Sequence, residues 1–221
     1  MVIFYSRPKD KAEKLYEFCK VHNFELITQS LISFEAVPFK LPEENFDAVF
    51  FTSPRSVDFF LKYAQLANST QIACIGSSTE KHLNELGYKA NFVGENSAEP
   101  EQVAQDFQIW LGSKTVLFPI SNQSNRSISK VLNEEQFIEV IVYNTIENSM
   151  KITPSPDVLI FSSPSNASAF LQKNSIDLNQ VVCSFGRTTH NYLMTLGVSS
   201  EVLEEPTEDA VIAFLVRSMG S

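Results

Sequence analysis

An internal repeat constrains the fold of this chain more than any other sequence feature. A shift of 110 residues places DAVFFTSPRSVDFFLKY (47–63) on DVLIFSSPSNASAFLQK (157–173), with six of 17 positions identical. The same shift places ACIGSSTEKHLNELG (73–87) on CSFGRTTHNYLMTLG (183–197), with five of 15 identical. Two blocks that keep one offset across intervening sequence indicate a duplication. The chain is therefore expected to contain two similar halves.

Each half alternates short apolar segments with amphipathic ones. This pattern is typical of a parallel sheet with helices on both faces. A weaker correspondence relates MVIFYSR (1–7) to TVLFPIS (115–121), each an apolar strand pattern before a polar helix, and strand-like segments follow at 24–37 and 137–148. The predicted fold class is α/β, with two similar parallel-sheet lobes.

The connections at 36–46 and 146–156 are equivalent under the same shift, and each carries two prolines. Two equivalent connections of this kind suggest that the chain crosses twice between the lobes. The sequence therefore predicts a two-stranded hinge.

Composition excludes several classes of protein. The formal net charge of −9 argues against nonspecific nucleic-acid binding, which depends on clustered Lys and Arg. No apolar run approaches the roughly 20 residues of a membrane helix, and MVIFYSRPKD lacks the features of a signal peptide. Three cysteines without CxxC spacing indicate reduced thiols in a cytoplasmic protein, and Cys74 and Cys183 are expected to be buried.

Polar turns follow the repeated apolar segments. Ser53 is expected to cap a helix whose first turn holds Pro54, and SSP at 162–164 repeats this pattern. Gly76 permits a tight turn, and Ser77 has capping-box spacing to Glu80. Residues 186–188 (GRT) occupy the same place in the second half.

In a parallel sheet these four turns lie at the carboxyl ends of strands, where ligands bind. Exposed N–H groups and the helix dipole favour anions there. Each turn alone is a common helix start, so helix capping and anion binding both remain open. Duplication of the turns, with Arg55 and Arg187 beside them, is the argument for an anion site.

Sequence patterns for metals and common cofactors are missing. His22, His82 and His190 show no metal-ligand spacing, so no metal site is predicted. No GxGxxG after a strand, GxxxxGK[ST] or GxSxG is present, which disfavours a nucleotide cofactor and an acyl-enzyme.

The motifs together resemble those of the uroporphyrinogen-III synthase family. They are D-x-x-x-F-[TS]-S-P at 47–54 and 157–164, I-G-S-S-T at 75–79, V-Y-N-T at 142–145, F-G-R-T-T at 185–189 and E-E-P-T at 204–207. The resemblance implies two flavodoxin-like, HemD-like α/β lobes in which the first β-α-β unit packs with the last third of the chain. The implied domains are 1–37 with 152–221, and 41–147, with linkers near 38–40 and 148–151.

The resemblance also implies an activity. The enzyme would be a hydro-lyase of haem, porphyrin and tetrapyrrole biosynthesis that cyclises hydroxymethylbilane to uroporphyrinogen III, with inversion of ring D and loss of water. No cofactor is implied. The implied protein is a cytoplasmic monomer with a transient contact to the preceding deaminase, and with no membrane or nucleic-acid partner.

By the same resemblance, Tyr143 of V-Y-N-T assists departure of the substrate hydroxyl. The implied substrate-binding residues are Thr52, Ser53, Arg55, Gly76, Ser77, Ser78, Ser163, Gly186, Arg187, Thr188 and Thr189. Arg187 and Ser77 depart from the family's pattern. Two alternatives stay open, a non-catalytic two-lobed module that binds a small anion or sugar and a family member retained as a partner for other tetrapyrrole enzymes.

Overall fold

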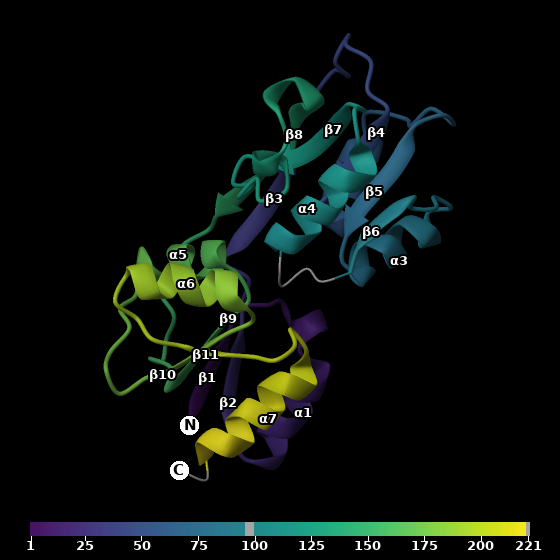
Figure 1. Cartoon of the computed structure of the whole chain (residues 1–221). Helices are drawn as coiled ribbons and strands as arrows, with labels where there is room; N and C mark the ends of the chain where they lie inside the picture. Colours follow the sequence, from purple (N-terminus) through teal and green to yellow (C-terminus); the bar gives the residue numbers. More distant parts are fainter. Residues whose placement is uncertain (96–99, 220–221) are drawn as a thin grey trace. The chain divides into compact units, whose positions relative to one another are not determined.

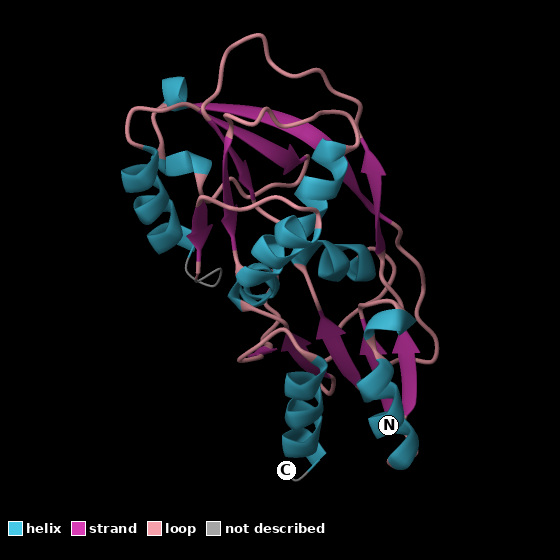
Figure 2. Cartoon of the chain, turned by 90° about the vertical axis from the view of Figure 1, so that its right-hand side faces the viewer, coloured by secondary structure: helices cyan, strands magenta, loops and turns pink. Residues whose placement is uncertain are grey.

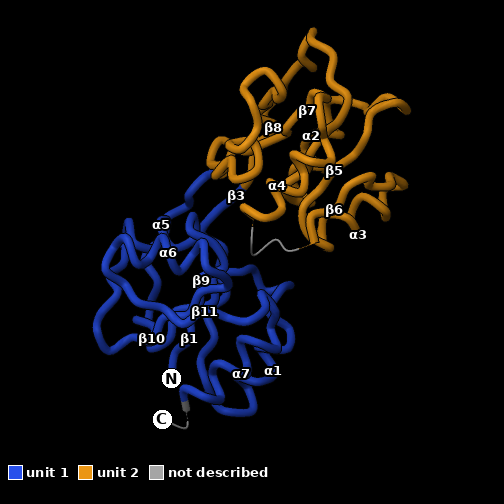
Figure 3. Tube along the Cα trace, viewed as in Figure 1, with its two compact units in different colours: residues 1–33, 146–221 blue, residues 34–145 orange. Residues whose placement is uncertain are grey.

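The computed structural model describes residues 1–95 and 100–219. Contacts within the chain divide it into two units (Figure 3), unit 1 being Met1–Ser33 with Ile146–Ser221 and unit 2 being Phe34–Thr145. The predicted domains place the boundaries a few residues further along the chain and stay a prediction. The chain passes from unit to unit at 33–34 and 145–146, upstream of the proline-marked connections.

Unit 1 contains a five-stranded sheet with strand order β11-β10-β9-β1-β2, and its strand pairs are parallel. Its strands are β1 (Val2–Tyr5), β2 (Glu25–Thr28), β9 (Val158–Phe161), β10 (Val181–Ser184) and β11 (Glu201–Val202). Its helices are η1 (Lys9–Lys11), α1 (Glu13–Val21), α5 (Pro164–Leu171), α6 (Arg187–Thr195) and α7 (Glu208–Met219) (Figure 1).

Alternation along β1 separates two cores in unit 1. Ile3 and Tyr5 pack in one core with Leu15 of α1 and Phe214 of α7. Phe4 lies in the other core with residues of α5 and α6. Successive strand residues point to opposite faces, so the buried run of β1 is covered by α1 and α7 on one side and by α5 and α6 on the other. Figure 2 distinguishes the helices from the strands by colour.

Unit 2 contains a six-stranded sheet with strand order β3-β8-β7-β4-β5-β6. Its strands are β3 (Ile32–Ala36), β4 (Ala48–Phe51), β5 (Gln71–Ile75), β6 (Phe92–Gly94), β7 (Val116–Ser121) and β8 (Phe137–Glu147). Its helices are α2 (Pro54–Leu61), α3 (Ser77–Glu85), α4 (Pro100–Leu111), η2 (Ser129–Val131) and η3 (Glu134–Gln136). Phe50 packs toward α4 and Phe51 toward α2 and α3, so helices again cover both faces.

The two sheets share one strand order. In unit 1 the order β2-β1-β9-β10-β11 matches β8-β7-β4-β5-β6 of unit 2. The first β-α-β segment therefore completes the sheet formed by the last third of the chain, as the family resemblance implied. The predicted α/β class with two similar parallel-sheet units is confirmed.

The polar helix predicted after the strand at 115–121 is wrong. Residues 122–136 form a loop with only the short 3-10 turns η2 and η3. Side chains of this segment bond to nearby backbone instead, since Ser121 accepts from the N–H of Gln123 and Ser124 from that of Arg126. Such local bonds compete with helix formation.

All three cysteines are free and buried, which confirms the expectation for Cys74 and Cys183. Burial raises the pKa of the Cys19 thiol to about 11 and that of both Cys74 and Cys183 to about 12. Within residues 1–95 and 100–219, none of the helices has the length and apolar character needed to cross a bilayer.

Candidate functional site

Both Ser-Pro turns cap helices, as predicted. The Ser53 hydroxyl accepts a hydrogen bond from the Ser56 N–H at 3.2 Å, and the Ser56 hydroxyl accepts one from the Ser53 N–H at 3.2 Å. The Ser163 hydroxyl accepts from the Asn166 N–H at 3.2 Å. Both caps follow the carboxyl ends of strands, so they fix the first turns of α2 and α5 there.

The two glycine turns differ from each other. Gly76 is the N-cap of α3 at φ 81°, and Ser77 is the first helical residue, so the predicted Ser77–Glu80 capping box is wrong. Gly186 caps α6 in extended backbone at φ −171°. Neither cap has a side-chain acceptor, because glycine has no side chain.

The residues after these glycines divide into exposed and buried ones. Ser77 and Ser78 after Gly76, and Arg187 and Thr188 after Gly186, are exposed. Thr189 is 3% exposed, and its N–H donates to the Gly186 carbonyl at 3.1 Å. Thr189 therefore belongs to the framework of its turn, and the other four side chains face solvent.

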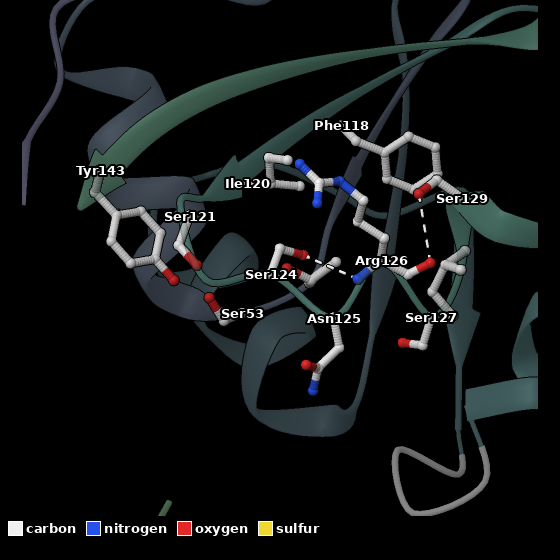
Figure 4. Close-up of a pocket in the computed structure, with 12 residues that line it drawn as sticks. Ser53, Phe118, Ile120, Ser121, Ser124, Asn125, Arg126, Ser127, Ser129 and Tyr143 are labelled. Atoms are coloured by element: carbon white, nitrogen blue, oxygen red, sulfur yellow. Dashed lines mark hydrogen bonds between the residues drawn. The ribbon is translucent and has the colours of Figure 1, made fainter. Parts of the chain in front are cut away.

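A cavity of about 270 Å³ lies in unit 2 (Figure 4). We call it the unit-2 cavity. Its lining residues come from the turn after β4, from β7 and the loop that follows it, and from β8; they are Thr52, Ser53, Phe118, Ile120, Ser121, Ser124, Asn125, Arg126, Ser127, Ile128, Ser129 and Tyr143.

The position of this cavity follows from the sheet topology. β4 and β7 are neighbours, but β7 leads to β8 on one side and β4 leads to β5 on the other. The connections therefore diverge between β4 and β7, which makes this the topological switch point of the sheet. Ligands of open α/β sheets bind in the crevice outside the strands' carboxyl ends at such a point.

Tyr143 reaches the cavity because of a bulge in β8. Ile120 pairs with Ile141, whereas the next residue, Ser121, pairs with Tyr143. The Tyr143 ring stacks on Phe59 with centroids 5.0 Å apart and meets Phe34 edge-on at 5.9 Å. These contacts fix the plane of the phenol ring.

The Tyr143 side chain presents its hydroxyl to the cavity. The residue is 8% exposed. Figure 4 shows its hydroxyl directed toward Ser53 and Ser121, and across the described residues it forms no hydrogen bond. A half-enclosed phenol with a free donor can hydrogen-bond to a ligand oxygen.

The structure brings together three of the predicted site residues, Thr52, Ser53 and Tyr143. Four others in unit 2 are not among the lining residues; they are Arg55, Gly76, Ser77 and Ser78. The Arg55 guanidinium instead lies 3.4 Å from the centre of the Phe34 ring. The remaining five belong to unit 1, after β9 and β10; they are Ser163, Gly186, Arg187, Thr188 and Thr189.

The sequence reasoning missed the loop after β7. SNQSNRSIS at 121–129 supplies most of the cavity wall, including Arg126. A run of Ser and Asn with one Arg, directly after a buried strand, was the available signal. Because this segment was predicted to be a helix, the signal was overlooked.

An ion pair holds Arg126 in the wall. Its Nε donates to Glu139 Oε2 at 2.6 Å, and the Ser129 hydroxyl donates to Glu139 Oε1 at 2.8 Å. Both carboxylate oxygens of Glu139 thus have a donor. The Arg126 backbone is left-handed, at φ 53°, which turns the chain sharply at the middle of the loop.

The cavity offers hydrogen-bond donors rather than a nucleophile or a metal centre. Its hydroxyls, its phenol and its guanidinium suit an anionic ligand with polar oxygens. In the two described stretches, His, Cys, Asp and Glu form no group suited to a metal ion.

The family model described as uroporphyrinogen-III synthase HemD matches residues 13–213. A Chlorobaculum parvum relative named uroporphyrinogen-III synthase is 24% identical, over 92% of this chain and 92% of its own. The Helicobacter pylori uroporphyrinogen-III synthetase structure has a TM-score of 0.69 at 21% identity and covers 99% of this chain and 98% of its own.

A mutant Thermus thermophilus uroporphyrinogen III synthase also gives a TM-score of 0.69, at 13% identity and with full coverage of both chains (100% each). At these identities the structural matches establish the fold, whereas the family model spans nearly the whole sequence. The shared fold, the repeated Ser-Pro turns and this match lead to one conclusion: the chain belongs to the uroporphyrinogen-III synthase (HemD) family.

Proposed function

We propose that this protein cyclises hydroxymethylbilane to uroporphyrinogen III, with inversion of ring D and loss of water. Its family membership supports the reaction. The observation that carries the proposal is the Tyr143 phenol, held by Phe59 and Phe34, with its hydroxyl facing the unit-2 cavity.

The reaction requires departure of the terminal hydroxyl of the substrate. The Tyr143 hydroxyl donates a hydrogen bond to this leaving group and assists its loss, which gives a reactive azafulvene. Ring closure through a spiro-pyrrolenine intermediate then inverts ring D. The protein directs closure by holding the substrate in one folded geometry, because the free substrate closes spontaneously to isomer I.

Carboxylate side chains of the substrate bind at the strand ends. Thr52, Ser53 and Arg55 contribute from the segment after β4, and Gly76, Ser77 and Ser78 from the turn after β5, the neighbouring strand of the same sheet. The unit 1 turns contribute Ser163, Gly186, Arg187, Thr188 and Thr189. Backbone N–H groups at these turns bind anions without a large positive charge, which fits a protein of formal net charge −9.

The proposal extends to the setting of the reaction. The enzyme is a hydro-lyase that acts as a cytoplasmic monomer and contacts the preceding deaminase transiently. Three buried, unpaired thiols support a reducing compartment.

The test is to generate hydroxymethylbilane in situ, add the purified protein, oxidise the products and separate porphyrin isomers I and III. The expected result is a catalytic, protein-dependent excess of isomer III. Isomer I alone, formed at the spontaneous rate by folded protein, would overturn the proposal and favour a non-catalytic binding module.

A further inference from the structure

We propose that Arg126 binds a carboxylate of the substrate pyrrole that bears the hydroxymethyl group, and so orients the leaving hydroxyl toward Tyr143. This inference rests on the proposed function and deepens it. It assigns a role to a side chain in the loop 122–136, which lies outside the repeated Ser-Pro and glycine turns.

Arg126 is an exposed residue that one ion pair joins to the cavity wall, and its other donors are not saturated. Only its Nε is used by Glu139, and Glu139 is itself fixed by Ser129. Guanidinium carries five N–H donors, four of them on the terminal nitrogens. Among the described residues, none forms a hydrogen bond or an ion pair with the two terminal nitrogens of Arg126.

The free donors are suited to a carboxylate. Two parallel N–H groups match two carboxylate oxygens, and such charge-assisted bonds are about twice as strong as neutral ones. The ion pair with Glu139 restricts the rotamers of Arg126 before the ligand arrives, so less entropy is lost on binding. Because Glu139 offsets the charge of Arg126, the proposal rests on the directed N–H donors rather than on net positive charge.

Arg126 and Tyr143 line the same cavity. Figure 4 shows the Arg126 side chain running back from the loop toward Ile120, while the Tyr143 hydroxyl points toward Ser53 and Ser121. The cavity volume, about 270 Å³, is below the 300–1,000 Å³ of a pocket that encloses a drug-sized ligand. Because the cavity is open to solvent, we place one substituted pyrrole ring inside it, with the rest of the tetrapyrrole extending outside.

These two donors define the orientation of that ring. If Tyr143 contacts the hydroxymethyl oxygen, the ring in the cavity is the terminal ring that carries it. Arg126 then contacts a carboxylate of that same ring. A two-point contact of this kind fixes the ring in its plane and selects one face for attack on the azafulvene carbon.

The binding test uses a bilane with methyl in place of hydroxymethyl, which keeps every carboxylate and cannot lose water. Its affinity is measured by calorimetry for the wild type, Arg126→Gln and Lys130→Gln. Lys130 is the matched control, since it is an exposed cation of the same loop that does not line the cavity. We expect Arg126→Gln to weaken binding by about 10- to 100-fold and Lys130→Gln by less than about twofold.

A second probe locates the contact without relying on the folding of a variant. It is the same unreactive bilane with alkyl groups in place of the carboxylates on the methyl-bearing ring only. Wild-type protein should bind it about 10- to 100-fold more weakly than the parent probe. Arg126→Gln should discriminate between the two probes about 10-fold less than the wild type does, because the contact from Arg126 is already lost. Equal binding of both probes by the wild type would overturn the assignment.

The two hypotheses fail in different ways. If the protein forms no isomer III but distinguishes the two probes, and Arg126→Gln loses that difference, the carboxylate site is supported and the proposed cyclase activity is wrong. Formation of isomer III with equal affinities for wild type and Arg126→Gln leaves the cyclase standing and overturns the role of Arg126.

Discussion

The segments between β1 and β2 and between β7 and β8 occupy equivalent places in the two sheets, yet they differ in structure. The first contains α1, which buries Leu15 and Cys19. The second is the loop 122–136, which buries Ile128 and Leu132 in the core of unit 2. Both segments keep two apolar residues four positions apart against their sheet, but only the first is helical.

The unit-2 cavity lies where unit 2 has a loop in place of a helix. In unit 1, α1 packs against α7 and covers one face of the sheet. In unit 2, the equivalent loop turns at Arg126 and places serine hydroxyls and one guanidinium beside Tyr143. Both segments thus bury two apolar residues against their sheet, while the polar residues between them determine whether the segment is a helix or the wall of a site.

The largest expected effects come from substitutions of the buried apolar residues in these two segments. Leu15→Ala and Ile128→Ala each remove a side chain that is at most 2% exposed, so each should lower the free energy of unfolding by about 2–5 kcal/mol. Only Ile128→Ala should also slow cyclisation, because Ile128 lines the cavity. Denaturation followed by the single tryptophan, Trp110 in unit 2, and by circular dichroism separates the two units.

Equal slowing of cyclisation by Leu15→Ala and Ile128→Ala, under conditions where both variants are folded, would contradict a role for the loop alone. In that case the α1 segment would contribute to the site as directly as the loop. If Ile128→Ala shifts the unfolding transition seen by Trp110 fluorescence and Leu15→Ala does not, each residue stabilises its own unit.

Next in size is a comparison of two tyrosines with unpaired hydroxyls. Tyr143→Phe should lower the cyclisation rate by about 10- to 100-fold with stability unchanged, because it removes the donor to the leaving group. Tyr5→Phe in unit 1 is the matched control: among the described residues no group meets hydrogen-bond geometry with the buried Tyr5 hydroxyl, and the nearby Arg7 acts on it mainly through its charge.

Tyr5→Phe should leave the rate unchanged and raise the free energy of unfolding by about 1 kcal/mol, because it removes an unsatisfied buried polar group. Steady-state rates and denaturation curves of both variants check these outcomes. A wild-type cyclisation rate for Tyr143→Phe would exclude the phenol from the mechanism. A lower cyclisation rate for Tyr5→Phe would instead implicate the buried tyrosine of unit 1.

Much of the fold could be predicted from the sequence. The repeat predicted two similar units, and continuous apolar runs in strands such as 48–51 and 158–161 indicated parallel sheets covered on both faces. The completion of unit 1 by residues 1–28 followed from the family resemblance, because tandem halves alone suggest a contiguous pairing.

The site could be predicted only in part, for physical reasons. The loop 122–136 carries Ile128 and Leu132 at helical spacing, so its apolar pattern resembles a helix, while the local serine bonds that prevent one depend on backbone geometry. The direction of the Tyr143 side chain depends on the bulge in β8, where one residue between Ile141 and Tyr143 is left unpaired. A bulge of this kind adds one residue and leaves no pattern in the sequence.

Alkaline pH should affect the units unequally. Burial raises the pKa of Cys19 and Cys183 in unit 1 from 9.0 to about 11 and about 12, and it also raises that of Tyr5, partly offset by Arg7. Unit 2 has only Cys74, with a pKa of about 12. Raised pKa values mean that the unfolded chain loses protons first, so stability is complete below pH 9 and falls as pH rises toward 11–12.

At pH 10 each buried thiol should cost about 1 kcal/mol, so unit 1 should lose about 1 kcal/mol more than unit 2. Denaturant titrations at pH 8 and pH 10, followed by circular dichroism and by Trp110 fluorescence, measure this difference. A larger shift of the Trp110 transition than of the circular dichroism transition would contradict it. Cys19→Ala should reduce the pH sensitivity of unit 1 alone.

The smallest expected effect separates the two glycine caps. Gly76 adopts φ 81°, whereas Gly186 adopts φ −171° and has no atom within 4 Å of an added Cβ. Replacing either glycine by alanine loses the same N-cap preference and the same unfolded-chain entropy, so these contributions cancel between the variants. Gly76→Ala alone adds left-handed strain and should be less stable than Gly186→Ala by about 1–2 kcal/mol. Equal free energies of unfolding from chemical denaturation would mean that the turn after β5 relaxes to a right-handed conformation, and that the two turns are interchangeable after all.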